Sequence, residues 1–282
     1  MRITPGRSLF VVALIVVLTG CGGSGSGGLA DSLNLNEDPS STLLVVESGG
    51  GFLPVDLVVN QGPGLVLMRD GTLIGQGPQI EIFPGPLLAN WQTSQLDQET
   101  LLFVLEELDA IGFDEIDQVE NNDAANTVAD APTTTVTFYN QDGEHSFSVY
   151  ALGLDTNTSD ARVPILANLV QELFDAATRG TGADYQPERI QVVARDGAGQ
   201  FDPADPTVNF RDWPLPLSFE EMGALDIEGW RCATFEGSEM EQLLEVFEGA
   251  NQQTYWTEGE VDHRLGVRPL FSFEEPCAPT LS

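Results

Sequence analysis

The sequence predicts an α+β fold in which antiparallel hairpins form the sheets and three amphipathic helices pack on them. Strand-like runs are interrupted by the turn dipeptides Asp70-Gly71, Asp142-Gly143 and Glu258-Gly259, which is typical of hairpins. Three other segments carry apolar residues at helical spacing. A parallel sheet would instead show continuous apolar strands with a helix between each pair.

The chain begins with a basic and then apolar segment. Arg2 and Arg7 accompany Leu9–Leu18, an unbroken apolar run of ten residues. A membrane-spanning helix needs roughly 20 apolar residues, whereas a signal peptide combines a basic start with a shorter apolar run. We therefore expect residues 1–20 to be a signal peptide. The alternative is a buried N-terminal helix.

The last residue of the apolar run and the three residues that follow it are Leu18-Thr19-Gly20-Cys21. They resemble the lipobox of bacterial lipoproteins, which implies cleavage before Cys21 and a diacylglyceryl group on the Cys21 sulfur. Such acyl chains would anchor the protein at the outer, extracytoplasmic face of the cell membrane. Residues 21–40 are rich in Gly, Ser, Asn and Asp, so we expect a flexible tether with a span of roughly 25 Å.

Residues 41–182 are predicted to form an α+β domain with two hairpin–helix units. The first helix has Leu101, Leu105 and Leu108 on one face, with Asp97 or Ser94 as its cap and Gly112 past its end. The second lies in "VPILANLVQELFDAATRG", where Pro164 suits the first turn and Gly180 the stop. Its predicted apolar face comprises Ile165, Leu166, Leu169, Val170, Leu173 and Phe174.

Residues 187–282 are predicted to form a smaller α+β domain. It should contain the strand "RIQVVAR", a long loop up to Ser218, a helix begun by a Ser238/Glu241 capping box, and a final hairpin. If Cys21 carries lipid, Cys232 and Cys277 remain, and an exported protein can form disulfides. We therefore predict a Cys232–Cys277 bridge, which would add about 3–4 kcal/mol of stability.

Three stretches of the mature chain, "DAPTTTVTF", "YALG" and "RPLF", resemble uncharacterised secreted lipoproteins of high-GC Gram-positive bacteria. The resemblance is patchy and implies no activity. It agrees with the assignment of the leader.

The chain is strongly acidic. It has 44 Asp and Glu against 11 basic residues, all of them arginine, and a net charge of −33. Removal of residues 1–20, with Arg2 and Arg7, changes this charge to −35. Nucleic-acid binding depends on cations that contact phosphates, so we exclude nucleic acid as a partner. The acidity favours either a cationic ligand or a plain solvated surface, and the even spread of the acids favours the solvated surface.

No motif indicates a particular enzyme chemistry. His145 and His263 each follow a predicted turn, and the alternation around His145 predicts a surface histidine. The sequence has no GxSxG nucleophile elbow, no HExxH zinc motif and no phosphate-binding loop. We therefore predict no cofactor, and whether the protein is an enzyme stays open.

Calcium is the metal that the sequence could accommodate most readily. Two polar turns offer oxygen ligands: Asp155, Asn157, Ser159 and Asp160 in one, and Glu120, Asn122 and Asp123 in the other. An EF-hand loop requires Gly at its sixth position and Glu at its twelfth. Counted from Asp155, these positions hold Asp160 and Leu166. A turn with helix-capping acids is therefore the preferred interpretation, and no metal site is assigned.

Aromatic residues gather in the C-terminal part of the chain. Trp230, Tyr255, Trp256 and the motif "WPLPL" could form an exposed patch for a partner or a glycan, or fill the core of the small domain. We expect them to be buried.

Together these features predict an exported, membrane-anchored lipoprotein that acts as a binding or interaction module on the cell surface. Its partners would be the membrane through Cys21 and an envelope protein or a cationic ligand. One alternative is a carboxylate-dependent hydrolase of extracellular or cell-wall glycans, which needs two carboxylates on either side of one sugar. A second alternative is an inert structural lipoprotein of the envelope.

Overall fold

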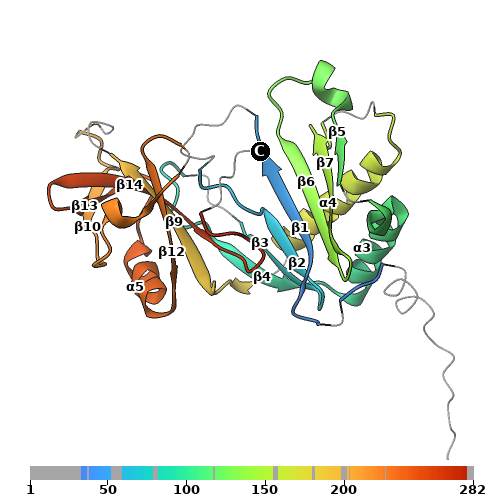
Figure 1. Cartoon of the computed structure of the whole chain (residues 1–282), viewed down its shortest axis with the longest axis horizontal. Coiled ribbons are helices and arrows are strands. Elements are labelled where there is room, and N and C mark those ends of the chain that lie inside the picture. The colour runs from blue at the N-terminus through green and yellow to red at the C-terminus, as the bar shows by residue number, and fades with distance from the viewer. Residues whose placement is uncertain are drawn as a thin grey trace, which may run out of the picture.

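The computed structural model describes residues 33–36, 38–51, 59–78, 82–116, 118–154, 158–179, 182–197, 202, 204–225 and 227–277. These residues form two mixed sheets and three α-helices (Figure 1). The predicted signal peptide and Cys21 lie outside the described residues. No helix in these ranges has the length and apolar character needed to cross a membrane.

The first sheet has eight strands. In spatial order they are β5 (Gln118–Asn121), β7 (Gly143–Tyr150), β6 (Thr133–Asn140), β1 (Thr42–Gly49), β2 (Leu65–Met68), β3 (Thr72–Gln76), β4 (Trp91–Gln95) and β8 (Ala183–Asp184). The predicted hairpins β2–β3 and β6–β7 are confirmed, because both pairs are antiparallel and directly connected. The edge strand β5 differs from the prediction, since it pairs with β7 in parallel.

Two helices belong to this half of the chain. Helix α3 (Gln98–Ile111) begins where the Asp97 carboxylate accepts the Thr100 amide at 2.8 Å, and it ends at Gly112, whose φ is 72°. Helix α4 (Arg162–Arg179) buries Leu166, Leu169 and Leu173 in the same cluster as residues of β1, β2 and β3. Of its predicted apolar face, Phe174 is the exception, because 39 % of it is exposed.

Part of the predicted tether, residues 33–36 and 38–40, belongs to the described structure. Leu33 and Leu35 are buried in the first core, and the Leu33 carbonyl accepts a hydrogen bond from the Asn140 amide. Ordered structure therefore begins before the predicted boundary at residue 41.

The second sheet has six strands. In spatial order they are β10 (Asn209–Asp212), β13 (Thr254–Glu258), β14 (Val261–Pro269), β9 (Arg189–Asp196), β12 (Trp230–Glu236) and β11 (Gly223–Ala224). The predicted hairpin at Glu258-Gly259 is confirmed by the antiparallel β13–β14 pair. Strand β10 was expected to be loop, and it pairs with β13 in parallel.

Helix α5 (Gly237–Phe247) follows β12 without a connecting loop. The predicted Ser238/Glu241 capping box is wrong, because the helix starts at Gly237 and its N-cap residue Glu236 makes no side-chain capping bond. A capping box occurs instead at Ser218 and Glu221, at the start of the short 3₁₀ helix Phe219–Glu221. Because the strand leads directly into the helix, the chain turns at Gly237, whose φ is 55°. This turn determines where the helix begins.

In each sheet, residues of one face share an apolar cluster with helical residues, whereas residues of the other face do not. Alternate residues of β14 belong to these two faces: Leu265 and Val267 cluster with α5, whereas Arg264, Gly266 and Arg268 occupy the other face. In the first sheet, Val66 and Ile74 likewise lie apart from the cluster that contains α3 and α4. We call the two faces whose residues lie outside the clusters with helical residues the inner faces.

Each half of the molecule contributes one segment that contacts the other half. Residues 85–87, which follow β3, run beside residues 250–252, where the Leu87 amide donates to the Ala250 carbonyl at 3.0 Å. Residues 270–277, which we call the strap, leave β14 and return to the first sheet. There Phe271 packs in a cluster with Val45, Val66, Ile74 and Trp91.

Candidate functional site

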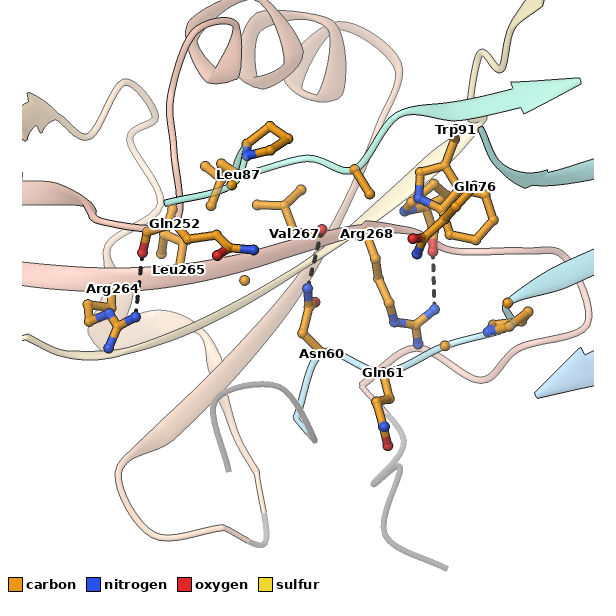
Figure 2. Close-up of a pocket in the computed structure, with 18 of the residues that line it drawn as sticks. Asn60, Gln61, Gln76, Leu87, Trp91, Gln252, Arg264, Leu265, Val267 and Arg268 are labelled. Atoms are coloured by element: carbon orange, nitrogen blue, oxygen red, sulfur yellow. Dashed lines mark hydrogen bonds between the residues drawn. The ribbon is translucent and has the colours of Figure 1, made fainter. Parts of the chain in front are cut away.

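A cleft of about 640 Å³ is lined by residues of both sheets, and residues from both faces of β14 contribute to it. Its floor is β14, and its two sides come from residues 60–64 and residues 82–91 (Figure 2). Gln76 and Trp91 line it from the first sheet, and Arg264 and Arg268 line it from the second. Clefts of this size at the junction of two structural units are the usual places for small-molecule ligands.

The floor of the cleft is elongated. Arg264 and Arg268 lie at opposite ends of the labelled part of β14 in Figure 2, with Val267 and Asn60 between them. Because a strand rises about 3.3 Å per residue, the floor from Arg264 to Pro269 is roughly 17 Å long. The cleft can therefore hold an extended ligand along the strand.

Gly266 allows residues 60–64 to approach β14 closely. A Cβ atom at Gly266 would lie 2.8 Å from the Cγ atom of Asn60, and one at Gly62 would lie 2.7 Å from Nη1 of Arg268. The Asn60 amide nitrogen donates to the Val267 carbonyl at 3.3 Å. Its Oδ1 atom is buried and has no hydrogen-bond partner, so Asn60 keeps an acceptor that a polar group could use.

Arg268 is buried at one end of the floor. Its Nη1 atom donates to Oε1 of Glu274 at 2.6 Å and to the Pro269 carbonyl at 3.1 Å. The other carboxylate oxygen of Glu274 accepts the Phe271 amide at 2.8 Å. Arg268 therefore holds the strap in place, and its charge is already compensated within the protein. Its Nε atom is buried without a hydrogen-bond partner.

Two further arginines extend the same inner face. Arg264 is the direct neighbour of Arg195 on β9, and Arg195 is the direct neighbour of Trp230 on β12. The guanidinium of Arg195 lies 5.1 Å from the centre of the Trp230 ring, which is the geometry of a cation–π contact. Arg264 donates to the Gln252 carbonyl at 3.4 Å (Figure 2). Three arginines thus share one face of the second sheet.

The lining of the cleft contrasts with the composition of the chain. The described residues that line it include no Asp and no Glu, in a chain that has 44 of them. Its polar side chains are instead arginines, the hydroxyl of Ser48 and the amides of Asn60, Gln61, Gln76 and Gln252. The described part of the lining therefore differs from the acidic composition of the chain.

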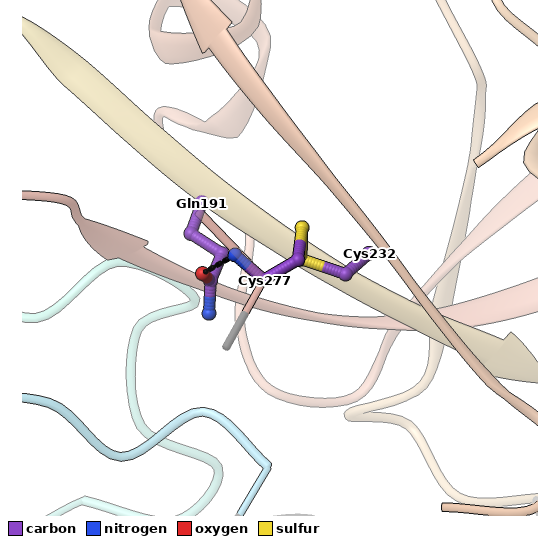
Figure 3. Close-up of a disulfide and its surroundings, with 3 residues drawn as sticks. All are labelled: Gln191, Cys232 and Cys277. Atoms are coloured by element: carbon purple, nitrogen blue, oxygen red, sulfur yellow. Dashed lines mark hydrogen bonds between the residues drawn. A yellow bond between two sulfur atoms is a disulfide. The ribbon is translucent and has the colours of Figure 1, made fainter. Parts of the chain in front are cut away.

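The predicted disulfide between Cys232 and Cys277 is confirmed (Figure 3). The two Cα atoms are 5.7 Å apart, and the Cys277 amide donates to Oε1 of Gln191 at 3.0 Å. Cys232 lies on the same face of β12 as Trp230. The bridge therefore fixes the end of the strap on the inner face of the second sheet.

Residues of the strap form an aromatic cluster with residues on the inner face of the first sheet. The Phe271 ring lies 5.7 Å from each of the rings of Trp91, Tyr185 and Phe273, and Phe273 lies 5.9 Å from Tyr139. Burial, together with the carboxylates of nearby glutamates, raises the pKa of Tyr139 to about 12. The Tyr139 phenol is therefore neutral wherever the cluster is intact below that pH.

The calcium candidates are only partly described. Asp155 and Asn157 lie outside the described residues. The carboxylate of Asp160 accepts hydrogen bonds from the guanidinium of Arg162, from Nε at 3.0 and 3.2 Å and from Nη2 at 2.7 Å, and these bonds lower the pKa of Asp160. Ser159 donates to Asp123 rather than facing an open site. No group of three His, Cys, Asp or Glu side chains suited to a metal occurs within the described ranges.

The prediction that His145 is a surface residue is wrong. His145 is 6 % exposed, and its ring nitrogens contact the Ile116 carbonyl and Oδ1 of Asn140. It shares the buried side of β7 with Phe147 and Val149, and this alternation was visible in the sequence. His263 is half-buried against the Phe219 ring at 4.0 Å, and burial lowers its pKa. The two histidines belong to different sheets.

The C-terminal aromatic residues are buried, as expected. Trp230, Tyr255 and Trp256 are 5 %, 2 % and 0 % exposed, and Trp213 of the "WPLPL" motif packs at 4.6 Å from Phe219. They therefore form core and do not provide an exposed patch.

Comparison of the chain with protein-family models, with curated proteins and with solved structures found no match. The candidate site is therefore inferred from the geometry of this chain alone. The sequence analysis missed Asn60, Arg264 and Arg268. The spacing of Arg264, Gly266 and Arg268 at alternate positions of a predicted strand was the one available signal, since it places two cations and a gap on one face.

Proposed function

We propose that this protein is an exported, lipid-anchored binding protein whose inter-sheet cleft holds a ligand. The observation that carries the proposal is the lining of the cleft, which combines arginines and amides without a described carboxylate in a chain of net charge −33. Because 44 of the 282 residues are acidic, a chance hollow on such a protein would be expected to include a few of them. A hollow lined differently is expected where a ligand has to be bound.

The arrangement of the helices supports the proposal. Helices α3, α4 and α5 share apolar clusters with the outer faces of the sheets, and we propose that they act as a rigid backing. The inner faces then remain for binding. A site built on strands that are supported from behind holds its side chains in place better than a site on loops.

The lipid anchor is proposed from the lipobox ending in Cys21 and from the basic and apolar residues before it. Phase partition of the protein in a cloud-point detergent tests it. We expect the wild-type protein in the detergent phase and the Cys21→Ala variant in the aqueous phase. Recovery of both in the same phase would contradict the anchor.

An envelope protein is proposed as a second partner, and a cationic ligand would be attracted by the acidic outer surface rather than by the cleft. Mild cross-linking in native membranes, followed by isolation of full-length protein, tests the envelope partner. We expect one stoichiometric partner that is lost with Cys21→Ala. A pattern that does not change in this variant would argue against an anchored interaction.

Hydrolysis of glycans is the weaker alternative. It requires two carboxylates on either side of one glycosidic bond, and the described lining of the cleft supplies none. Such a mechanism would need acids from outside that lining. We therefore prefer binding to catalysis for this cleft.

Substitution of a lining residue by a bulky side chain tests whether the cleft binds a ligand. Gln76 is exposed in the cleft, whereas Gln171 is exposed on α4, so Gln76→Trp and Gln171→Trp form a matched pair. Each purified protein is dialysed against envelope extract, and retained small molecules are identified by mass spectrometry. We expect wild type and Gln171→Trp to retain a species that Gln76→Trp does not. Equal retention by all three proteins would overturn the proposed site.

A further inference from the structure

We infer that the ligand of the cleft is an uncharged saccharide, with one of its hydroxyl groups held between Asn60 and Arg268. This inference rests on the proposed function, because it names the chemical class of the ligand for the same cleft. Three features carry it: a buried acceptor beside a buried donor in the floor, the compensated charge of Arg268, and the amide groups along the cleft.

Asn60 and Arg268 offer one hydrogen-bond acceptor and one donor at neighbouring positions of the floor. Oδ1 of Asn60 and Nε of Arg268 are buried, and neither atom has a hydrogen-bond partner among the described residues. The two side chains are neighbours, because the Asn60 amide bonds to the carbonyl of Val267, the residue before Arg268 (Figure 2). Both residues line the cleft, and Arg268 is 6 % exposed. Buried polar atoms are normally hydrogen-bonded, so this pair indicates a bound group.

A hydroxyl group is the simplest single group that satisfies both atoms. The orientation of the Asn60 amide is fixed, because only its nitrogen can donate to the Val267 carbonyl. One hydroxyl oxygen can accept from Nε of Arg268 and donate its proton to Oδ1 of Asn60. An ionised carboxylate only accepts, and it would face Oδ1 without a proton to donate. Because both atoms are covered, the hydroxyl group enters with a small movement of the half-buried Asn60 side chain.

The charges of the cleft are consistent with an uncharged ligand. The guanidinium of Arg268 already bonds to the Glu274 carboxylate at 2.6 Å. A further anion would lose its hydration beside a cation whose charge is compensated. Arg264 donates to the Gln252 carbonyl at 3.4 Å, so it too has a partner in the protein. The described lining holds no carboxylate with which a cationic ligand could pair.

Further amides indicate several hydroxyl groups on the same ligand. Gln61, Gln76 and Gln252 line the cleft, and Figure 2 shows them at different places along β14. A primary amide both donates and accepts hydrogen bonds, and so does a hydroxyl group. The floor is roughly 17 Å long, which suits a short chain of sugar rings. The C–H faces of such rings can contact Ile82 and Leu87, which also line the cleft.

Isothermal titration of the full-length protein tests this inference, in a zwitterionic detergent that has no sugar head group. The probes are the uncharged trisaccharides maltotriose, mannotriose and triacetylchitotriose. Triethylene glycol dimethyl ether is the control, because its oxygens accept hydrogen bonds but cannot donate them. We expect at least one trisaccharide to bind, and the ether to bind at least about tenfold more weakly. The affinity should change little with salt, because the ligand carries no charge to be screened.

Two variants test the contact with the hydroxyl group. Asn60→Leu removes the acceptor, and Arg268→Lys removes Nε but keeps a cation beside Glu274. Each should weaken binding of the trisaccharide about tenfold. Asn209→Leu is the matched control, which should leave binding unchanged. Asn209 is also half-buried and donates its amide to a backbone carbonyl, but it lies on β10 and is not among the lining residues. Unchanged binding by both cleft variants overturns the inference.

Monodeoxy derivatives of the bound trisaccharide identify the hydroxyl group itself. One derivative should bind the wild type about tenfold more weakly than the parent sugar does. This difference should disappear in Asn60→Leu, because the variant has already lost the contact. If Asn60→Leu does not fold, the wild type decides alone, and equal binding of the parent and every derivative overturns the inference.

The remaining outcomes separate this inference from the proposed function. An affinity that falls steeply as salt rises would show that the ligand is charged, and the binding cleft would stand. Absence of binding by all three trisaccharides, with another species retained by wild type but not by Gln76→Trp, would exclude this class of ligand and leave the cleft intact. Equal retention by wild type and Gln76→Trp would overturn both.

Discussion

The guanidinium of Arg268 lies 2.6 Å from the carboxylate of Glu274, and this ion pair ties the floor of the cleft to the strap. The two side chains are only 7 % and 13 % exposed, so each charge is compensated mainly by the other. A pair in such surroundings is expensive to break from one side, because the remaining charge is left buried.

Glu274→Gln should therefore lower the free energy of unfolding by about 3–5 kcal/mol. Urea unfolding measures it, with Glu172→Gln as the control. Glu172 pairs with Arg179 at the surface, where the side chains are 37 % and 63 % exposed, and its removal should cost at most about 1 kcal/mol. Equal effects of the two variants would show that the Arg268–Glu274 pair is not held in a dry environment.

Removal of the disulfide should destabilise the protein by about 3–4 kcal/mol, because the bridge closes a loop between residues 45 positions apart. The variant is Cys232→Ala/Cys277→Ala, and thermal unfolding of the oxidised wild type is the reference. We also expect protease cleavage within residues 270–277 to become faster in this variant. A strap that stays protected would mean that Phe271 and Glu274 suffice to hold it.

Gly266→Ala should destabilise the protein by about 1–3 kcal/mol, the usual cost of overpacking. The added methyl group would lie 2.8 Å from Cγ of Asn60 and 2.9 Å from Cγ2 of Val193. Gly49→Ala is the control, because its nearest neighbour would be at an ordinary 3.6 Å. Chemical denaturation of both variants checks the prediction, and equal stability would indicate that residues 60–64 do not press against β14.

Alkaline titration should reveal one tyrosine with a strongly raised pKa. The pKa of Tyr139 is about 12 in the folded protein and 10.0 for an ordinary tyrosine. Because the folded pKa is the higher one, the stabilising contribution of neutral Tyr139 is complete below pH 10 and is lost as the pH rises through 12. Tyrosinate absorbance should show a late step that Tyr139→Phe lacks. The same late step in Tyr139→Phe would contradict the assignment.

Features that depend on neighbouring residues were predictable from the sequence. The turn dipeptides located three hairpins, and Asp97 and Gly112 marked the ends of α3 because capping uses side chains and backbone angles within a few positions. The disulfide followed from counting cysteines. The error at Ser238 has the same local origin, since a capping box in the sequence does not decide where the preceding strand ends.

The cleft could not be predicted, because it depends on contacts between distant parts of the chain. Asn60 lies on Gly266 across 206 positions, and Pro86 pairs with Asn251. The parallel pairs β5–β7 and β10–β13 were also unpredictable, because no local turn in the sequence marks a parallel pair. The alternation of Arg264, Gly266 and Arg268 indicated one face, but nothing in the sequence showed what would lie opposite.

The position of the strap at the very end of the described chain has a consequence for biosynthesis. The N-terminal half leaves the ribosome first, with Val45, Val66, Ile74 and Trp91 already translated, but Phe271 is made 180 residues after Trp91. Until then this apolar surface lacks Phe271 and Phe273, although Tyr139 and Tyr185 are made earlier and also pack against it. This part of the core therefore stays incomplete for about two thirds of the synthesis. A truncation that removes only the last dozen residues should behave as a misfolding mutant rather than as a shortened protein.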